Sequence, residues 1–242
     1  MNSSEDEDKV TLWEREENPL LCIQLTDENV LSVRQYISHD DRWGIYSQVW
    51  DGGIAMVKYL IDSGIHGTCL DLGSGTGIVG LAFVKCRPHC RAVLTDLAEA
   101  LELLQENVNL NFANDNNNLM VCELVWGQEI FSNKILQVLL SEKDIVVTGA
   151  DIVYRRTIMQ PLLTTLKQII DLCPKAKIIL SIQSIRTHMD EFLELALSQG
   201  WIIDFKANVT VVNESQATID YTSIPVKSSP GVVNVFEMTR NG

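Results

Sequence analysis

The chain has 242 residues, 46% of them hydrophobic, and its formal net charge is −13. This length and apolar content predict a single large α/β domain over residues 20–242. The acidic balance disfavours broad electrostatic binding to nucleic acid or anionic lipid, and no apolar run is long enough to span a bilayer. We therefore expect a monomeric cytoplasmic protein with no membrane attachment, the nucleus being the alternative compartment.

The first residues of the chain are strongly acidic. Within residues 1–17, seven acids stand against Lys9 and Arg15, which predicts a flexible arm over residues 1–19. The segment lacks the basic and apolar regions of a signal peptide. We interpret the arm as a solvated tail, and a guide for a basic protein substrate is the alternative.

After the arm, apolar residues mark a regular series of elements. Segments 20–25 and 30–36, separated by a turn-like stretch, predict a β-hairpin. Further strands are predicted at 68–72, 92–95, 119–126, 144–148, 177–182, 201–205 and 232–238. Helices are predicted at 53–61, 78–86, 98–111, 157–172 and 189–199. The alternation predicts a Rossmann-like, seven-stranded, mostly parallel sheet with helices on both faces, and the last strand could enter antiparallel because no obvious helix precedes it.

Six cysteines are spread through these strands and helices. In a cytosolic chain we interpret them as reduced, small hydrophobic side chains. Cys86, His89 and Cys90 are close in sequence, but no second cluster of ligands accompanies them, and Pro88 indicates the end of a helix. We therefore predict no metal site.

A glycine-rich loop follows the strand at 68–72. Residues 69–77 read Cys-Leu-Asp-Leu-Gly-Ser-Gly-Thr-Gly. Three glycines allow positive φ angles and the close approach of a ligand: Gly73, Gly75 and Gly77. Asp71 is unfavourable beside the phosphates of a dinucleotide but favourable beside an ammonium and a sulfonium. The loop, including Ser74, therefore predicts an S-adenosylmethionine site, and a dinucleotide is the alternative because Gly80 completes a G-x-G-x-x-G pattern.

A second acid follows the next strand. Asp96 comes directly after the segment at 92–95, at the place where a carboxylate can accept hydrogen bonds from both hydroxyls of a ribose. The alternative is that Asp96 caps the helix that follows Leu97. With the glycine-rich loop at a suitable distance, the ribose interpretation is favoured.

Several short motifs together resemble a known family. They are Gln48-Val49-Trp50-Asp51, Leu70-Asp71-Leu72-Gly73-Ser74-Gly75-Thr76-Gly77, Thr95-Asp96-Leu97, Leu124-Val125-Trp126-Gly127 and Ala150-Asp151-Ile152-Val153-Tyr154. In this order they resemble the class I, seven-strand methyltransferases that use S-adenosylmethionine, and within them the family 16 methyltransferase-like group. The resemblance covers roughly residues 20–240. Many characterised members methylate protein lysines, so it implies a protein substrate with a lysine acceptor.

The resemblance also implies which residues surround the cofactor. Trp50 would lie beside it and exclude water from the sulfonium, whereas a core or lid aromatic is the alternative. Trp126 would offer its ring to the adenine, with Gly127 permitting the approach, and a packed core tryptophan is the alternative. Leu97 and Ala150, at the ends of two strands, complete the predicted cofactor site.

Asp151 and Tyr154 are the candidate catalytic residues. They follow the fourth strand of the sheet, where a residue would face the transferring methyl group. Methyl transfer mainly requires a neutral nucleophile to be aligned in a site without water. Asp151 could accept a hydrogen bond from the lysine amine, and Tyr154 could supply a second oxygen and an aromatic wall. The alternative is that Asp151 caps the following helix.

Other functions are kept open. The acceptor could be a protein histidine, a nucleic acid or a small molecule, although the Asn-Pro-Pro-Tyr type of tetrapeptide that suits a planar nitrogen is absent. A non-catalytic protein that keeps the cofactor fold is a further alternative. The stretch Ser181-Ile182-Gln183-Ser184 departs from relatives that carry an acid or an aromatic residue after the fifth strand. The far wall of the acceptor pocket is therefore expected to differ.

Overall fold

The computed structural model describes residues 18–36, 44–112, 117–129, 133–213, 215–221, 225 and 229–240. The predicted acidic arm lies outside them apart from Asn18 and Pro19. The strands are β1 (Leu20–Gln24), β2 (Val30–Arg34), β3 (Thr68–Leu72), β4 (Arg91–Asp96), β5 (Leu119–Glu123), β6 (Ile145–Ala150), β7 (Lys177–Gln183), β8 (Trp201–Val211), β9 (Ala217–Asp220) and β10 (Val232–Arg240). The helices are α2 (Asp51–Asp62), α3 (Ile78–Cys86), α4 (Leu101–Phe112), α5 (Asn133–Ser141), α6 (Arg156–Leu172) and α7 (Met189–Ser198), with short 3-10 turns η1 (Ile45–Ser47) and η2 (Ala98–Ala100).

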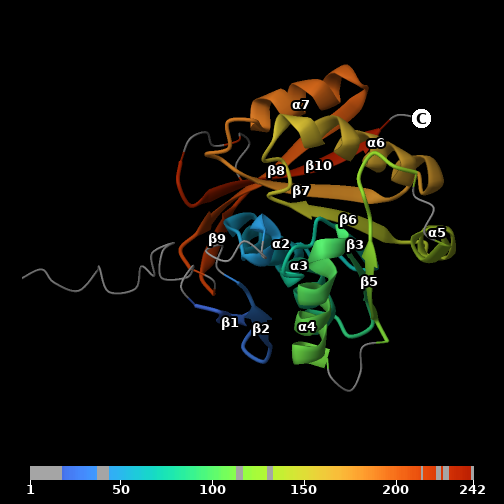
Figure 1. Cartoon of the computed structure of the whole chain (residues 1–242). Coiled ribbons are helices and arrows are strands. Elements are labelled where there is room, and N and C mark those ends of the chain that lie inside the picture. Colours follow the sequence, from blue (N-terminus) through green and yellow to red (C-terminus); the bar gives the residue numbers. More distant parts are fainter. Residues whose placement is uncertain are drawn as a thin grey trace, which may run out of the picture.

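The main sheet has the strand order β5-β4-β3-β6-β7-β10-β8-β9 (Figure 1). Strands β5, β4, β3, β6 and β7 pair in parallel, whereas β10 is antiparallel to both β7 and β8. The Rossmann-like fold is confirmed, and the last strand enters antiparallel. The predicted number of seven strands is wrong, because this sheet contains eight.

The extra strand is explained by the length of β8. The prediction ended this strand at residue 205, but apolar and polar residues continue to alternate beyond it, and Ala207, Val209 and Val211 are buried. This period of two is typical of a strand with one buried face. The extension offers an edge with which β9 pairs antiparallel, from Asn208 to Val211. With only four residues, β9 has no apolar run that could have identified it.

Two hydrophobic clusters lie on opposite faces of the sheet. Helices α2, α3 and α4 and the hairpin β1–β2 contribute to one, and α5, α6 and α7 to the other (Figure 1). Strand β3 is buried on both faces, as expected for a central parallel strand. Helix α5 was not predicted, although its Ile135 and Leu139 are almost fully buried. Among the described residues no helix has both the length and the apolarity to cross a bilayer.

The predicted N-terminal hairpin is confirmed. β1 and β2 pair antiparallel from Leu20 with Arg34 to Gln24 with Val30. Its inward residues, Leu21, Ile23, Leu31 and Val33, are at most 2% exposed and belong to the same cluster as α2 and α3. The hairpin therefore packs on the main domain beside α4, outside the main sheet (Figure 1).

Candidate active site

A cavity of about 400 Å³ opens at the carboxyl ends of the parallel strands. The loops after β3, β4, β5 and β6 line it, and so does the segment 44–50 that precedes α2, which we call the flap. Ligands of open α/β sheets bind at this end of the strands, and the volume lies within the range of ligand sites. All of the predicted site residues except Gly77 and Gly127 contribute to the cavity wall, and Gly127 lies against Pro161 of α6.

The glycine-rich loop has the predicted backbone. Gly73, Gly75 and Gly77 have φ angles of 62°, 55° and 83°. A Cβ on Gly75 would lie 2.9 Å from the carbonyl oxygen of Tyr46, and so the flap and the loop approach each other too closely for a side chain. Gly77 is the N-cap of α3 and shapes the loop from outside the cavity.

Gly80 has a packing role. A Cβ on Gly80 would lie 2.1 Å from a methyl carbon of Leu94, and so this glycine lets α3 pack closely on β4. The G-x-G-x-x-G spacing that suggested a dinucleotide is thus accounted for by helix–strand packing, which both kinds of site require.

Asp71 lines this cavity, and one oxygen of its carboxylate has no close hydrogen-bond partner among the described residues. The residue is 2% exposed, and Thr148 donates a hydrogen bond of 2.7 Å to its Oδ1. Its Oδ2 is buried and has no hydrogen-bond partner among the described residues. Burial raises the pKa of Asp71 to about 6, although the Thr148 hydrogen bond opposes the shift. A buried carboxylate oxygen without a donor fits an ammonium group.

This raised pKa leads to a pH prediction. Asp71 is neutral in the folded protein below pH 6, so donor affinity should fall about tenfold from pH 7 to pH 5. In the unfolded chain the pKa of Asp71 is near 3.8, so the folded protein binds this proton more tightly than the unfolded chain does. The tighter binding stabilises the fold by on the order of 3 kcal/mol below pH 3.8, and this stabilisation is lost as the pH rises through 6. Calorimetry and denaturant titrations of wild type and Asp71→Asn measure both effects. Equal pH dependence in the two proteins would contradict the prediction.

Asp96 holds the glycine-rich loop. Its Oδ2 accepts a 2.8 Å hydrogen bond from the Gly75 N–H, and its Oδ1 accepts one of 2.8 Å from Leu97. The 3-10 turn η2 begins after Leu97 and has no side-chain cap. Burial raises the pKa of Asp96. Each carboxylate oxygen keeps a free lone pair for a ligand hydroxyl, so the ribose role stays a prediction that this geometry permits.

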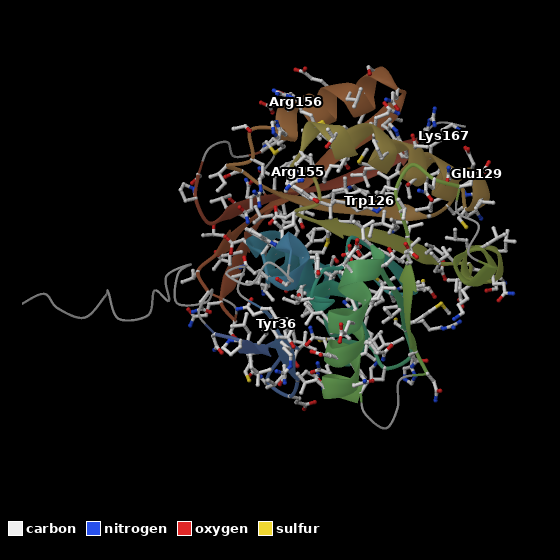
Figure 2. The ribbon with its side chains drawn as sticks, viewed as in Figure 1. Tyr36, Trp126, Glu129, Arg155, Arg156 and Lys167 are labelled. Carbon is white, nitrogen blue, oxygen red and sulfur yellow. The ribbon has the colours of Figure 1, made fainter. Side chains whose placement is uncertain are left out.

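Two tryptophans stand on different walls. Trp50, at the N-cap of α2, donates a 2.9 Å hydrogen bond from Nε1 to the carbonyl of Ile45 and so closes the flap. Trp126 follows β5, which ends at Glu123 and not at the predicted residue 126 (Figure 2). A Cβ on Gly73 would lie 2.9 Å from the Trp126 ring, and so the indole rests against the glycine-rich loop. Both rings line the cavity.

Asp151 is the most constrained residue of the site. It is 6% exposed, and among the described residues it is the one non-glycine residue with a positive φ, 54°. Its Oδ2 accepts hydrogen bonds from the Gly52 N–H at 2.7 Å and from Gln183 Nε2 at 2.9 Å. Its Oδ1 accepts one of 2.9 Å from the Gln183 N–H. Burial raises its pKa, and these bonds and nearby Arg186 act in the opposite direction.

These contacts change the interpretation of Asp151. The alternative that it caps the following helix is wrong, because α6 has Arg155 at its N-cap and no side-chain cap. The carboxylate instead caps α2, through Gly52. It joins the end of β6 to α2 and β7, and three donors already occupy it. A direct hydrogen bond to an acceptor amine is still only a prediction.

Two arginines complete the wall near Tyr154, and the sequence did not single them out. Tyr154 is partly buried, and burial raises its pKa. The guanidinium of Arg155 lies 5.5 Å from the Tyr154 ring centre. That of Arg186 lies 5.3 Å from the Trp50 ring centre, and its Nε is buried without a partner among the described residues. Arg155 directly follows the Asp-x-x-Tyr motif. Gln183 belongs to the stretch 181–184, for which the sequence predicted a different far wall, and Arg186 follows that stretch.

The cysteines stay apart from this site. All six are free, and Cys86 and Cys90 line a separate hollow near the amino ends of β3 and β4. Within the described part of the chain, no three His, Cys, Asp or Glu side chains gather closely enough to hold a metal ion.

A comparison with known families identifies the chain. The profile of the lysine methyltransferase family matches residues 26–199. The chain belongs to the lysine methyltransferase family. The predicted resemblance is thereby confirmed, and the family agrees with the predicted S-adenosylmethionine donor.

Individual relatives match shorter stretches. EEF1A lysine methyltransferase 3 of Xenopus tropicalis is 34% identical over 151 residues, which are 60% of this chain and 61% of that protein. Protein-lysine N-methyltransferase EFM3 of Chaetomium thermophilum is 28% identical over 156 residues, 63% of this chain and 46% of its own length. The UPF0665 family protein C23C4.06c of Schizosaccharomyces pombe is 32% identical over 94 residues, which are 36% of this chain and 29% of that protein. The chain thus spans between 29% and 61% of these relatives.

Solved structures agree on the fold. Ribosomal protein L11 methylase from Lactobacillus delbrueckii subsp. bulgaricus has a TM-score of 0.53 at 14% identity, over 91% of this chain and 99% of the other. The glycopeptide N-methyltransferase MtfA has a TM-score of 0.54 at 10% identity, over 78% and 90% of the two chains. Identities this low show a shared fold.

Proposed function

We propose that the protein transfers a methyl group from S-adenosylmethionine to a lysine side chain of a protein substrate. The observation that carries the proposal is a single cavity that joins two kinds of wall. The glycine-rich loop, Asp71 and Asp96 form one wall, and Trp50, Tyr154 and the two arginines form the other. Membership of the lysine methyltransferase family supports the choice of acceptor.

The first wall fits the donor. The donor supplies an activated methyl group on a sulfonium. The unpartnered Oδ2 of Asp71 can accept a hydrogen bond from its ammonium, and the lone pairs of Asp96 can accept hydrogen bonds from its ribose. The Trp126 ring can stack on its adenine. The Asp71 carboxylate in this wall would be unfavourable beside the phosphates of a dinucleotide.

The second wall fits a lysine that must become neutral before it reacts. A lysine amine has a pKa of about 10.4 in water, and burial beside cations lowers that value. Arg155 and Arg186 place positive charge at this wall, while Trp50 and Tyr154 exclude water. The Tyr154 oxygen can accept a hydrogen bond from the amine and orient it. Asp151 supports this wall by fixing Gly52 and Gln183.

The test is methylation of a proteome extract with isotope-labelled donor, followed by mass spectrometry of the modified residues. Methyl-lysine that depends on the added enzyme is the expected result. Methyl-histidine, labelled nucleic acid or a labelled small molecule would support the alternative acceptors. Donor binding without any transfer would support the non-catalytic alternative.

Tyr154 provides a matched pair of variants. Tyr154→Phe keeps the aromatic wall and loses the phenolic oxygen, whereas Tyr154→Ala loses both. We expect the phenylalanine variant to retain more turnover than the alanine variant, with donor affinity within about twofold of wild type in both because the side chain faces the acceptor. Turnover is measured with labelled donor and affinity by calorimetry. Loss of donor affinity in both variants would instead place Tyr154 beside the donor.

The proposal also covers the oligomeric state, the cellular compartment and the class of substrate. We infer a monomer in the cytoplasm, with the nucleus as alternative, and we infer no nucleic-acid substrate from the net charge of −13. Light scattering on an eluting peak measures the oligomeric state, and fluorescence imaging of a tagged full-length protein identifies the compartment.

A further inference from the structure

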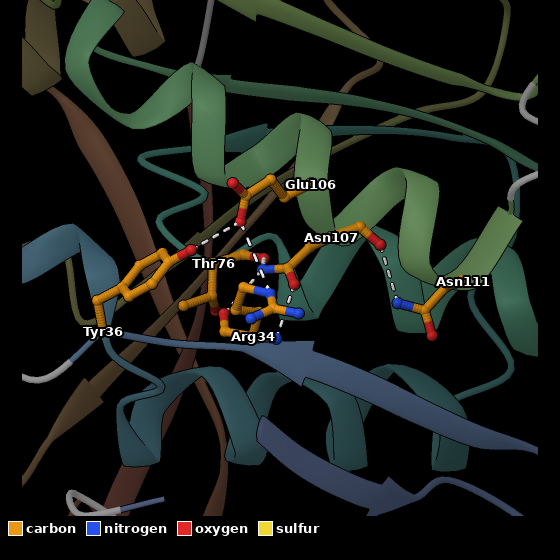
Figure 3. Close-up of polar contacts among 6 residues, drawn as sticks. All are labelled: Arg34, Tyr36, Thr76, Glu106, Asn107 and Asn111. Carbon is orange, nitrogen blue, oxygen red and sulfur yellow. Dashed lines mark hydrogen bonds and ion pairs between the residues drawn. The ribbon is translucent and has the colours of Figure 1, made fainter. Parts of the chain in front are cut away.

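Two asparagines of α4 pair with strand β2 in the manner of a neighbouring strand. Asn111 accepts a 3.0 Å hydrogen bond from the Ser32 N–H and donates one of 2.6 Å to the Ser32 carbonyl. Asn107 does the same with Arg34, at 2.7 and 2.9 Å (Figure 3). Four residues of helix rise about 6 Å and two residues of strand about 6.8 Å, so the two repeats match. The side-chain amides thereby supply hydrogen-bond partners for the backbone N–H and carbonyl groups at the outer edge of β2.

The two asparagines differ in their remaining donor. The second N–H of the Asn111 amide donates a hydrogen bond to the backbone carbonyl of Asn107, within α4 itself. The second N–H of the Asn107 amide donates a 2.9 Å hydrogen bond to the carbonyl of Thr76, in the glycine-rich loop. Asn107 is fully buried, so water cannot replace this bond. Asn107 therefore connects the hairpin to the loop, and Asn111 does not.

The same end of β2 also holds the flap. The Tyr36 N–H donates to the carbonyl of Ser47 at 2.9 Å, and the Ser47 hydroxyl donates back to the Tyr36 carbonyl at 2.8 Å. The Val49 N–H donates to the side-chain oxygen of Gln35 at 3.1 Å. Residues 34–36 thus contact both the flap and, through Asn107, the glycine-rich loop, which are two adjoining parts of the cavity wall.

A further contact fixes the direction of this strand end. The Tyr36 hydroxyl donates a 2.9 Å hydrogen bond to Glu106, and the Arg34 guanidinium lies 3.7 Å from the same oxygen (Figure 3). Glu106 directly precedes Asn107 on α4. Two successive residues of α4 therefore hold the backbone and the side chains of residues 34–36.

We propose that Asn107 is a positioning residue for the methyl donor. It holds the Thr76 carbonyl, and through it the turn of the glycine-rich loop, at the distance from the flap that the donor requires. The proposal rests on the proposed function for the identity of the donor. It adds that the N-terminal hairpin is part of the donor site, although no residue of β1 or β2 lines the cavity.

The experiment compares Asn107→Leu with Asn111→Leu. Both substitutions keep the branched shape and the number of heavy atoms of the side chain, and both remove the amide contacts to β2. Only the first also removes the contact to Thr76. We expect Asn107→Leu to weaken S-adenosylmethionine binding about tenfold, which corresponds to one hydrogen bond of about 1.4 kcal/mol. Asn111→Leu should stay within about twofold of wild type. Affinity is measured by calorimetry, with the folded fraction of each sample determined by thermal unfolding.

A ligand-free measurement accompanies the binding experiment. Hydrogen exchange at the Gly75 and Gly77 amides should be faster in Asn107→Leu than in Asn111→Leu, because these amides are bonded only while the loop is closed. Asn107→Ser, which puts a single hydroxyl in place of the amide, serves if the leucine variant does not fold. The proposal would be overturned if the two leucine variants changed donor affinity and exchange rates to the same extent, or if neither variant changed them. Failure of the wild-type protein to bind S-adenosylmethionine would reject the donor, and the exchange rates would still test the role of Asn107.

Discussion

Asp151→Ala is expected to abolish methyl transfer and to lower the free energy of unfolding by roughly 3–5 kcal/mol, as when one partner of a buried charged contact is removed. The substitution leaves three buried donors, the N–H groups of Gly52 and Gln183 and the Gln183 amide, without their acceptor. It also places alanine at a φ of 54°, which glycine tolerates better. Turnover with labelled donor and denaturant unfolding measure the two effects.

Two companion variants separate the causes. Asp151→Gly removes the carboxylate but relieves the backbone, so its stability should exceed that of Asp151→Ala by about 1 kcal/mol while transfer stays absent. Gly52→Ala keeps the carboxylate but places a Cβ 2.5 Å from it, so it should also impair transfer. A folded Asp151→Ala protein with wild-type turnover would refute the role. Loss of donor affinity in parallel with turnover would move Asp151 into the donor site.

Asp96→Ala is expected to weaken donor binding by at least about tenfold, because hydrogen bonds to a charged group contribute about 1.5–3 kcal/mol each. Two hydroxyls of the ribose would lose their acceptor, and the Gly75 N–H would lose the bond that fixes the loop. Calorimetry with S-adenosylmethionine measures the change, and thermal unfolding verifies that the variant is folded.

Glu123→Ala is the matched control. Glu123 lies opposite Asp96 in the β4–β5 register, but it does not line the cavity, so its removal should leave donor affinity unchanged. An Asp96→Ala protein that loses stability but binds the donor normally per folded molecule would assign Asp96 a purely structural role.

The sequence was most informative where the determinants are local. The strand at 68–72 and the helix at 78–86 were predicted with the bounds that β3 and α3 have, since an apolar run, three glycines and a proline mark their ends. The positive φ angles of Gly73, Gly75 and Gly77 followed from residue type alone. Strand β9 was missed because it has only four residues and pairs with the edge of β8. Helix α5 is as long as α3, but no glycine or proline marks its ends.

The partners of the site residues could not be predicted in the same way. The Asp151 carboxylate bonds Gly52, which is 99 residues away, and Gln183, which is 32 residues away. The sequence indicated an acid in the right place, but not that its oxygens were already occupied. The connection from Asn107 to Thr76 is likewise invisible without the three-dimensional path of β2.

The position of β10 has a consequence for synthesis of the chain. This strand comes last among the described strands, yet it lies between β7 and β8, which precede it by many residues. Until Val232–Arg240 has left the ribosome, β8 and β9 cannot join the other strands, and β7 and β8 each present an unpaired edge. We expect nascent chains that end before residue 232 to be recognised by chaperones and to expose residues that are protected once β10 has paired with β7 and β8.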